Sequence, residues 1–481
     1  MEKTEIPYSE GEKTLRLLEP ARNLALTYAV TGLDLLYLGV AVLVFPRIAE
    51  KSIFAEYRIL VLYSGYAGFL HLGLLSGFYL ESLHSNSLGR KRALLRKTRR
   101  YLYGFLFLLA PLVAFIFVLL NPSASKFTVA ALILSWFLLN GQTLCNYAAQ
   151  TQNGFNRFFI YNCAGRCVGL VFVCLIAISG SVSTVTLDIS FLLPIAVAVV
   201  VAEVLSSRVD HATAVQEGAI DETRPVTLNW RPCAHLYAAN VFATLALSVD
   251  KVVVAAQFAK GIFADYSFAF SLSSLVLYAG DGVATATLPL LVKTRLVGKA
   301  TLQPDLIWIG LYWFAPFAFW PARLFVEHWY PAYKSSETYL GFFSATLPAI
   351  IYCKSYCIST SIAAKASHLQ SRVNFAGIVS IAIGICGAEY YDAMPISVCR
   401  GWCGGVFIWA ALSCWCLSRN DEVNVAPQLR QGLVSAGLSS LAFGASYYAM
   451  RYGALAGPVT HLLLTAAIIL LFAVVSRTRA R

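Results

Sequence analysis

Ionisable side chains interrupt the long apolar stretches of this sequence, and eight of them are candidate site residues. They are Asp34, His71, Asp250, Asp281, Arg166, Lys251, Lys354 and Arg400. A charged side chain at the centre of a bilayer costs about 2.5–3.5 kcal/mol on insertion scales, so such residues should face the interior of a helix bundle and mark functional sites. The carboxylates and the imidazole could bind and release a coupling ion, whereas the arginines and lysines could bind an anionic group at several depths.

The apolar stretches around these residues are long enough to cross a membrane. Of the 481 residues, 58% are hydrophobic and only 13% are charged, and the mean hydropathy is +0.66. A soluble domain usually carries about 25% charged residues, and an apolar run of roughly 18 residues crosses the hydrocarbon as a helix. The sequence therefore predicts an all-α polytopic membrane protein.

We predict fourteen spans, and the distribution of basic residues orients them. The approximate ranges are 24–45, 58–80, 101–120, 128–147, 158–179, 189–207, 236–258, 265–291, 305–325, 338–362, 372–390, 394–417, 433–450 and 456–476. With the amino terminus inside, the inside segments carry 25 of the 37 Lys and Arg residues and the outside segments carry eight. This asymmetry predicts that both termini are cytoplasmic.

The densest basic segment is "GRKRALLRKTRR" at 89–100. It could recruit anionic lipid or a phosphorylated substrate at the inner leaflet, or it could only anchor the orientation of the flanking spans. Because the basic residues gather in the inside segments, the net charge of +12 reflects membrane topology. No nucleic-acid partner is expected.

A short segment is repeated at matching places in the chain. "IFAEY" (53–57) and "IFADY" (262–266) lie 209 residues apart, each in an outside turn that runs into the next span. Six spans separate the copies, so both face the same side, and the sequence predicts two parallel six-helix lobes plus a C-terminal helical hairpin. Such halves are a transporter architecture with the substrate path between the lobes. We interpret the repeat as evidence of two equivalent lobes and not as a binding motif, with its tyrosines as surface anchors.

The predicted domains follow this repeat. They are a cytoplasmic N-terminal segment (1–23), an N-lobe of spans 1 to 6 (24–207), a cytoplasmic linker (208–235), a C-lobe of spans 7 to 12 (236–417) and a C-terminal hairpin with a basic tail (418–481). On the same offset His71 aligns one position before Asp281, so the lobes carry titratable groups at nearly equivalent depth. We assign ion coupling or gating to four residues: Asp34, His71, Asp250 and Asp281.

Two longer segments carry a family resemblance. In "IFAEYRILVLYSGYAGFLHLGLLSG" (53–77) an acidic-Tyr turn leads into a helix, and "LALSVDKVVVAAQFAKGIFADYSFAFSLSSLV" (245–276) has a Ser-x-Asp-basic string, an apolar helix end and a Gly-x-x-x-Tyr-like turn. With the fourteen-span layout, they resemble the polysaccharide (O-antigen type) flippases of the multidrug/oligosaccharidyl-lipid/polysaccharide exporter superfamily. The sequence departs from that family at His71, where the family's Leu-Asp-Leu-Gly-Leu-like string has an acid.

The resemblance implies a flippase that moves a polyprenyl-diphosphate-linked oligosaccharide from the cytoplasmic to the periplasmic leaflet of the bacterial inner membrane, for surface polysaccharide biosynthesis. It implies alternating access between the lobes, driven by a coupling ion that is a proton or sodium. Membrane lipids and other polysaccharide-assembly proteins are the further partners that it allows. In this reading a cationic track binds the diphosphate, and its members are Arg166, Lys251, Lys354 and Arg400.

Structural alternatives stay open for several of these residues. Asp250 and Lys251 adjoin, so either could pair with a neighbouring helix and only hold the bundle together. Arg400 lies near the outer end of its span and could extend its side chain to the interface. His71 could be a satisfied core histidine.

Three other functions are alternatives to this one: a polysaccharide polymerase or ligase, a drug antiporter and a peptidoglycan lipid-precursor flippase. A polysaccharide polymerase or ligase would present catalytic residues on a sizeable outside loop, but the longest outside segments, 46–57 and 326–337, are about a dozen residues long. No phosphate loop, Ser/His/Asp set or metal-spaced cluster occurs, so no enzymatic activity, metal or cofactor is expected. A drug or organic-cation antiporter of the same superfamily should favour an acidic cavity. A peptidoglycan lipid-precursor flippase fits the spans and the cations equally well.

Overall fold

The computed structural model describes a polytopic helical protein. The described residues are 10–84, 87–122, 124–152, 154–180, 182–214, 230–296, 303–363, 367–419, 426–453 and 455–467. Within these ranges nine helices are long and apolar enough to cross a membrane, or ten if one bent pair counts as a single span. The prediction of an all-α polytopic membrane protein is confirmed.

The first half of the chain forms helices α1 to α7. These are α1 (Glu10–Ile48), α2 (Lys51–Ser64), the 3-10 helix η1 (Gly65–Phe69), α3 (Leu74–His84), α4 (Leu88–Leu120), α5 (Lys126–Thr151), α6 (Phe155–Ser179) and α7 (Thr184–Ala214). Long uninterrupted helices are expected here, because lipid offers no partner to a backbone amide or carbonyl and each must be satisfied within its own helix.

The second half forms helices α8 to α17. These are α8 (Trp230–Ala246), α9 (Val249–Gln257), α10 (Lys260–Leu296), α11 (Gln303–Phe314), η2 (Pro316–Ala318), α12 (Phe319–Trp329), η3 (Pro331–Tyr333), α13 (Ser336–Ile350), the π-helical segment η4 (Ile351–Cys357), α14 (Ile358–Ala363), α15 (Ser367–Tyr391), α16 (Pro395–Ser418), α17 (Ala426–Ala449) and η5 (Met450–Tyr452). A further apolar helix covers Ala456–Ala467.

Within the described residues each predicted span falls on one helix or on consecutive helices, and several spans are broken; residues 468–476 of the last predicted span lie outside the described part of the chain. The span predicted at 58–80 consists of α2, η1 and α3, and the one at 338–362 of α13, η4 and α14. The span predicted at 236–258 bends by 43° between α8 and α9. Breaks at membrane depth are tolerated where the backbone lies inside the protein or lines a cavity, so they point to the places where a site should be sought.

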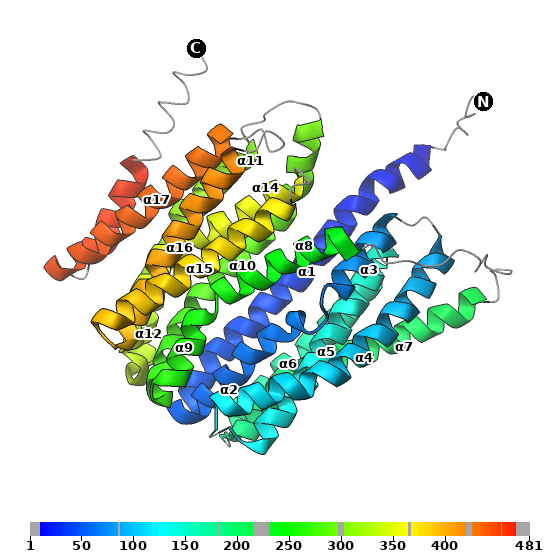
Figure 1. Ribbon diagram of the computed structural model, residues 1–481, viewed down its shortest axis with the longest axis horizontal. Coiled ribbons are helices and arrows are strands. Elements are labelled where there is room, and N and C mark those ends of the chain that lie inside the picture. Colours follow the sequence, from blue (N-terminus) through cyan, green and yellow to red (C-terminus); the bar gives the residue numbers. More distant parts are fainter. Residues whose placement is uncertain are drawn as a thin grey trace, which may run out of the picture.

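The helices of each half pack mainly on one another (Figure 1). The two halves meet where α1, α2 and α3 contact α10, α9 and α8, and we call this region the interface. Helix α17 contacts α11, α13 and α16 of the second half. The domain boundaries stay predictions, because residues 215–229 lie outside the described part of the chain.

The first and last described helices mark one end of the bundle, and the turns that contain the repeated segment mark the other. The start of α1 and the end of the helix Ala456–Ala467 lie at the same end (Figure 1), which we call the inner end, and their cytoplasmic location stays a prediction. The turns from α1 to α2 and from α9 to α10 lie at the opposite, outer end.

Tyr57 and Tyr266 of the repeated segment are only 5% and 0% exposed. The expectation that they anchor at the membrane surface is therefore wrong, because they pack between helices.

Candidate functional site

A cavity of about 340 Å³ lies between the two halves, beside the break that separates α2 from α3. Its walls come from α2, η1, α3 and α5 of the first half and from α8 of the second. Besides His71, the polar residues that line it are Ser64, Ser76, Asn140, Thr143, Tyr147, Tyr237, Asn240 and Thr244. Because both halves contribute, the cavity must change shape if the halves move relative to each other.

The break in the second span is built by the backbone and stabilised by neighbouring side chains. Leu72 and Gly73 have φ angles of 46° and 83°, a left-handed conformation that ends the helix and is strained for a leucine. Carbonyls at and before the break accept hydrogen bonds from side chains of α5 and α8. The donors are Trp136 Nε1 to the Tyr63 carbonyl (3.0 Å), Asn140 Nδ2 to that of Ala67 (2.8 Å) and Tyr237 Oη to that of Phe69 (2.7 Å). These bonds meet the backbone's requirement for partners away from water.

The lining offers neutral hydrogen-bonding groups next to aromatic rings. Among the described residues that form it, none is a lysine, an arginine or a carboxylate, and His71 is the one histidine. Asn240 is exposed, and its side chain makes no hydrogen bond to a described residue. Tyr147 packs against Tyr79 with ring centroids 4.6 Å apart. Hydroxyls, amides and ring faces in one cavity suit a neutral, polyhydroxylated ligand.

His71 is held by the break itself. The backbone N–H of Gly73 donates to its Nδ1 at 3.1 Å, and its ring centroid lies 5.7 Å from that of Tyr237. An Nδ1 that accepts a hydrogen bond carries no proton, so this geometry favours the neutral imidazole. The residue thus faces the cavity and supports the turn at once, and its role in ion coupling stays a prediction.

Two of the predicted acids have cationic partners from distant parts of the chain. Arg166 on α6 donates a hydrogen bond to Asp34 on α1, and its guanidinium lies 5.3 Å from the ring centre of Tyr37. Lys354 in η4 lies 2.6 Å from Asp281 on α10. Neither acid has a cation nearby in the sequence. The fold brings a cation to each acid, and each cation comes from the same half of the protein as its acid.

The adjacent Asp250 and Lys251 form a buried pair of their own. Lys251 Nζ lies 3.0 Å from Asp250 Oδ1, and the two side chains are 7% and 0% exposed. Tyr266 donates its hydroxyl proton to the other Asp250 oxygen at 2.7 Å. Lys251 Nζ also lies 3.4 Å from the ring centre of Phe270, a cation–π contact. Every strong partner of this pair comes from the second half.

Arg400 differs from the other three predicted cations. It is exposed on α16, its guanidinium lies 5.8 Å from the ring centre of Phe342, and it has no ion pair with a described residue. Three of the four predicted cations thus have a carboxylate partner that neutralises them in this conformation. The use of these cations in substrate binding stays a prediction.

Some of the predicted residues converge at the interface. Asp34 lies on α1 and Asp281 on α10, and these two helices contact each other between the halves. The two ion pairs therefore involve helices of the interface, whereas Arg400 lies on α16.

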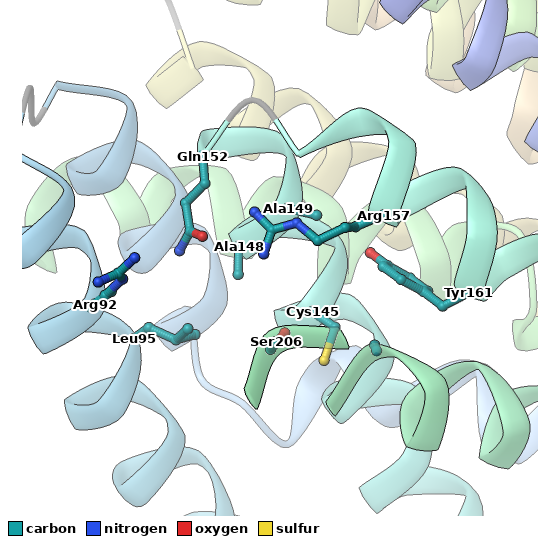
Figure 2. A pocket seen from close by; sticks show the side chains of 10 residues that line it. Arg92, Leu95, Cys145, Ala148, Ala149, Gln152, Arg157, Tyr161 and Ser206 are labelled. Carbon is teal, nitrogen blue, oxygen red and sulfur yellow. The ribbon is translucent and has the colours of Figure 1, made fainter. Parts of the chain in front are cut away.

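A second, smaller pocket lies at the inner end of the first half, between α4, α5, α6 and α7 (Figure 2). Arg92 from α4 and Arg157 from α6 line it together with Gln152 and Tyr161, and its enclosed volume is about 30 Å³. That volume holds about two water molecules. The pocket is too small to admit a substrate.

Some side chains of the basic segment 89–100 bond within the protein, and others are exposed. Lys91 donates to the carbonyl of Thr151 at 2.6 Å, and Arg99 lies 2.7 Å from Glu203. Arg90, Arg96, Lys97 and Arg100 of the segment are exposed. Part of the segment therefore holds helices of the first half together, and part lies at the surface.

The cavity lining is the part of the site that the sequence reasoning missed. Its signal was present as the glycine-rich string "SGYAGFLHLG" (64–73) inside a predicted span, because three glycines in ten residues weaken a helix. No group of three or more His, Cys, Asp or Glu side chains that could hold a metal ion occurs in the described ranges.

The fold is similar to that of two solved membrane transporters. The lipid II flippase MurJ in an inward closed conformation has a TM-score of 0.62 and 12% identity, with 93% of this chain and 98% of that chain covered. An inward-facing multidrug resistance MATE family transporter of the MOP superfamily has a TM-score of 0.55 and 12% identity, covering 85% of this chain and 99% of that one. No family model and no curated protein matches the sequence. At this identity the likeness shows a shared fold.

Proposed function

We propose that the protein is a flippase that moves an oligosaccharide linked to polyprenyl diphosphate from the cytoplasmic to the periplasmic leaflet of a bacterial inner membrane. The observation that carries this proposal is the cavity between the halves, whose described lining is neutral, rich in hydroxyl and amide groups and aromatic. Sugars present hydroxyls and apolar ring faces, which such a lining can bind without charge. The likeness to a lipid II flippase and to a multidrug transporter supports a transport role.

The lipid diphosphate needs cations, and two of the predicted ones are best placed for it. Arg166 and Lys354 have side chains 19% and 31% exposed, whereas that of Lys251 is 7% exposed. Their partners Asp34 and Asp281 lie on α1 and α10, which contact each other across the interface. A proton or sodium ion that neutralised one of these carboxylates would release its cation for the phosphate oxygens. Ion binding and diphosphate binding would then be coupled.

The alternative functions differ in the kind of cargo that the cavity would have to bind. A drug or organic-cation antiporter needs an acidic cavity, but the described lining has no carboxylate. A peptidoglycan lipid-precursor flippase carries the same lipid diphosphate chemistry, and the MurJ likeness favours it as the second candidate. The two flippase candidates are separated by the glycan and not by the fold.

Reconstituted proteoliposomes test the proposal. The vesicles carry either a polyprenyl-diphosphate oligosaccharide or lipid II, and an impermeant glycan-cleaving enzyme reports how fast the lipid leaves the protected leaflet. We expect the wild-type protein to move the oligosaccharide lipid. Transfer of lipid II alone would establish the second candidate, and transfer of neither would overturn the proposal.

Two cavity substitutions and one control show whether the cavity binds the glycan. Thr143→Val and Asn240→Leu remove polar groups from the lining, and each should slow flipping about three- to tenfold, the effect of one lost hydrogen bond. Thr346→Val is the matched control. Like Thr143, Thr346 bonds a carbonyl of its own helix, but it is buried in α13 and does not line the cavity.

A further inference from the structure

The two copies of the repeated segment face each other across the outer end of the interface. Helix α2 begins at Lys51 and α10 begins at Lys260, and each lysine precedes its copy of the segment by the same spacing. Arg58 Nε donates to Ser267 Oγ at 3.0 Å, and these residues occupy the same position in their copies, 209 residues apart. A direct contact between equivalent positions indicates an approximate two-fold axis between the two helices.

Each lysine pairs with the acid of the other copy. Lys51 Nζ lies 2.7 Å from Asp265 Oδ1, and Lys260 Nζ lies 2.6 Å from Glu56 Oε1. The approximate two-fold axis exchanges these two ion pairs. Within one copy the lysine and the acid are five positions apart, and residues at that spacing do not lie on one face of a helix. The charges of each copy are therefore balanced by the other half of the protein.

Each carboxylate is also held by a hydroxyl from its own half. Thr184 Oγ1, at the start of α7, donates to Glu56 Oε2 at 2.9 Å, and Ser335 Oγ, just before α13, donates to Asp265 Oδ2 at 2.5 Å. One oxygen of each carboxylate thus bonds within its half and the other bonds across the interface. The acids are fixed in place, and the lysines make the connection between the halves.

Aromatic residues close the space beside the ion pairs. The ring centroid of Tyr333 lies 5.9 Å from that of Phe54 and 4.9 Å from that of Phe268. Lys51 Nζ lies 5.0 Å from the ring centre of the same tyrosine. Phe54 and Lys51 belong to the first half and Tyr333 to the second, so the contacts of Tyr333 with Phe54 and Lys51 exist only while the outer end is closed.

The position and exposure of the lysines show that their role is not local. A lysine at the first position of a helix lies at the positive end of the helix dipole, where it does not stabilise its own helix. The side chains of Lys51 and Lys260 are 32% and 38% exposed. A lysine that separates from its acid therefore returns to water and is not left buried without a partner. Such pairs can close and reopen.

We propose that Lys51, Glu56, Lys260 and Asp265 form a reciprocal latch. The two crossed ion pairs keep the outer end closed, and both must break before the cavity can open to the outside. The latch rests on the proposed function only in that the halves move relative to each other, because its contacts do not depend on the cargo. It makes opening cooperative, since loss of one pair leaves the same two helices joined by the other.

Hydrogen–deuterium exchange of the full-length protein in lipid nanodiscs tests the latch. Lys51→Glu places two negative charges side by side and should raise amide exchange in both outer turns, 46–57 and 258–267, about threefold or more. The double reversal Lys51→Glu with Asp265→Lys restores an ion pair and should return exchange to within about twofold of the wild type. Lys260→Glu, alone and combined with Glu56→Lys, should behave in the same way.

Lys334→Glu is the matched control. Lys334 is exposed at the same end of the molecule and has no ion pair with a described residue. Equal exchange in this variant and in Lys51→Glu would overturn the latch, and so would double reversals that fold but stay as open as the single ones. Exchange in α15 and α16, which contact each other closely within the second half, separates opening from misfolding. An increase confined to the outer turns is opening.

The exchange experiment is made without cargo, so it separates the latch from the proposed function. If the outer turns respond as expected but no oligosaccharide lipid is moved, the latch stands and the proposed function fails. If the lipid is moved and the reversals leave exchange unchanged, the latch alone is overturned.

Discussion

The ion pairs between the two repeated segments and those inside the membrane connect the molecule in opposite ways. The outer pairs, Lys51–Asp265 and Lys260–Glu56, join one half to the other. The inner pairs, Arg166–Asp34, Lys354–Asp281 and Lys251–Asp250, each lie within one half. A movement of one half against the other must break the outer pairs and can leave the inner pairs intact. The ion pairs between the repeated segments therefore control whether the halves can separate at the outer end, whereas the ion pairs inside the membrane stabilise each half.

The surroundings of the two sets fit this division. Outer lysines meet water when they separate, so the net value of each pair is small, typically below about 1 kcal/mol. An inner charge that loses its partner stays in a medium of low dielectric constant, where an unpaired charge is strongly destabilising. Substitutions in the two regions should therefore differ in the size and in the kind of their effects.

The largest effect is expected at the most buried inner pair. Lys251→Met leaves Asp250 charged and 0% exposed, which should lower the free energy of unfolding by about 3 kcal/mol or more. Combining it with Asp250→Asn should recover most of the loss, because the amide oxygen can still accept from Tyr266. Chemical unfolding in mixed micelles measures both. A single variant as stable as the wild type would show that this pair does not hold the second half together.

A smaller loss of stability, with a separate effect on transport, is expected for Arg166. Asp34 and Arg166 are 34% and 19% exposed, so Arg166→Met should cost only on the order of 1 kcal/mol. Asp34→Asn with Arg166→Met should restore stability but still slow flipping about tenfold, because a cation for the diphosphate is missing. The unfolding and proteoliposome assays report the two effects independently. Full flipping by the double variant would leave this pair with a structural role alone.

The smallest effect is expected from salt, and it separates the two sets directly. Raising the ionic strength from about 0.1 to 1 M shortens the Debye length from about 10 to 3 Å, which weakens exposed pairs more than buried ones. Exchange in the outer turns should rise by up to about twofold, while exchange around Arg166 and Lys354 stays constant. In a Lys51→Met, Lys260→Met variant the outer turns should no longer respond. Equal salt effects in both regions would contradict the division.

Hydropathy predicted the helices better than their contacts. The described part of every predicted span is helical, because a backbone in lipid must satisfy its polar groups within its own helix wherever the local composition is apolar. The break at Leu72 and Gly73 was not predicted, since glycines in an apolar run are also compatible with an unbroken helix. The cavity was missed for a related reason. Ser, Thr, Asn and Tyr are common within membrane spans, and only neighbouring helices decide which of them face a shared space.

The repeated segment shows how far the sequence alone could go. It correctly placed both copies at one end of the molecule, and two more residues on the amino-terminal side, "KSIFAEY" and "KGIFADY", would have included the lysines of the latch. Even so, the spacing within one copy suggests no pairing, because the partner of each charge lies in the other copy. The latch follows from the sequence only once the two helices are known to face each other.

The sequence by itself determined that this is a helical membrane protein, where its apolar helices lie and which of them carry charges, because these properties depend on the local cost of placing side chains in lipid. The tertiary structure decided which charges meet. Asp34 pairs with a residue 132 positions away and Asp281 with one 73 positions away, whereas Lys51 reaches 214 positions into the other half. Apolar periodicity is the same for any order of helices in space, so only the packed arrangement could separate charges that stabilise one half from charges that join the two.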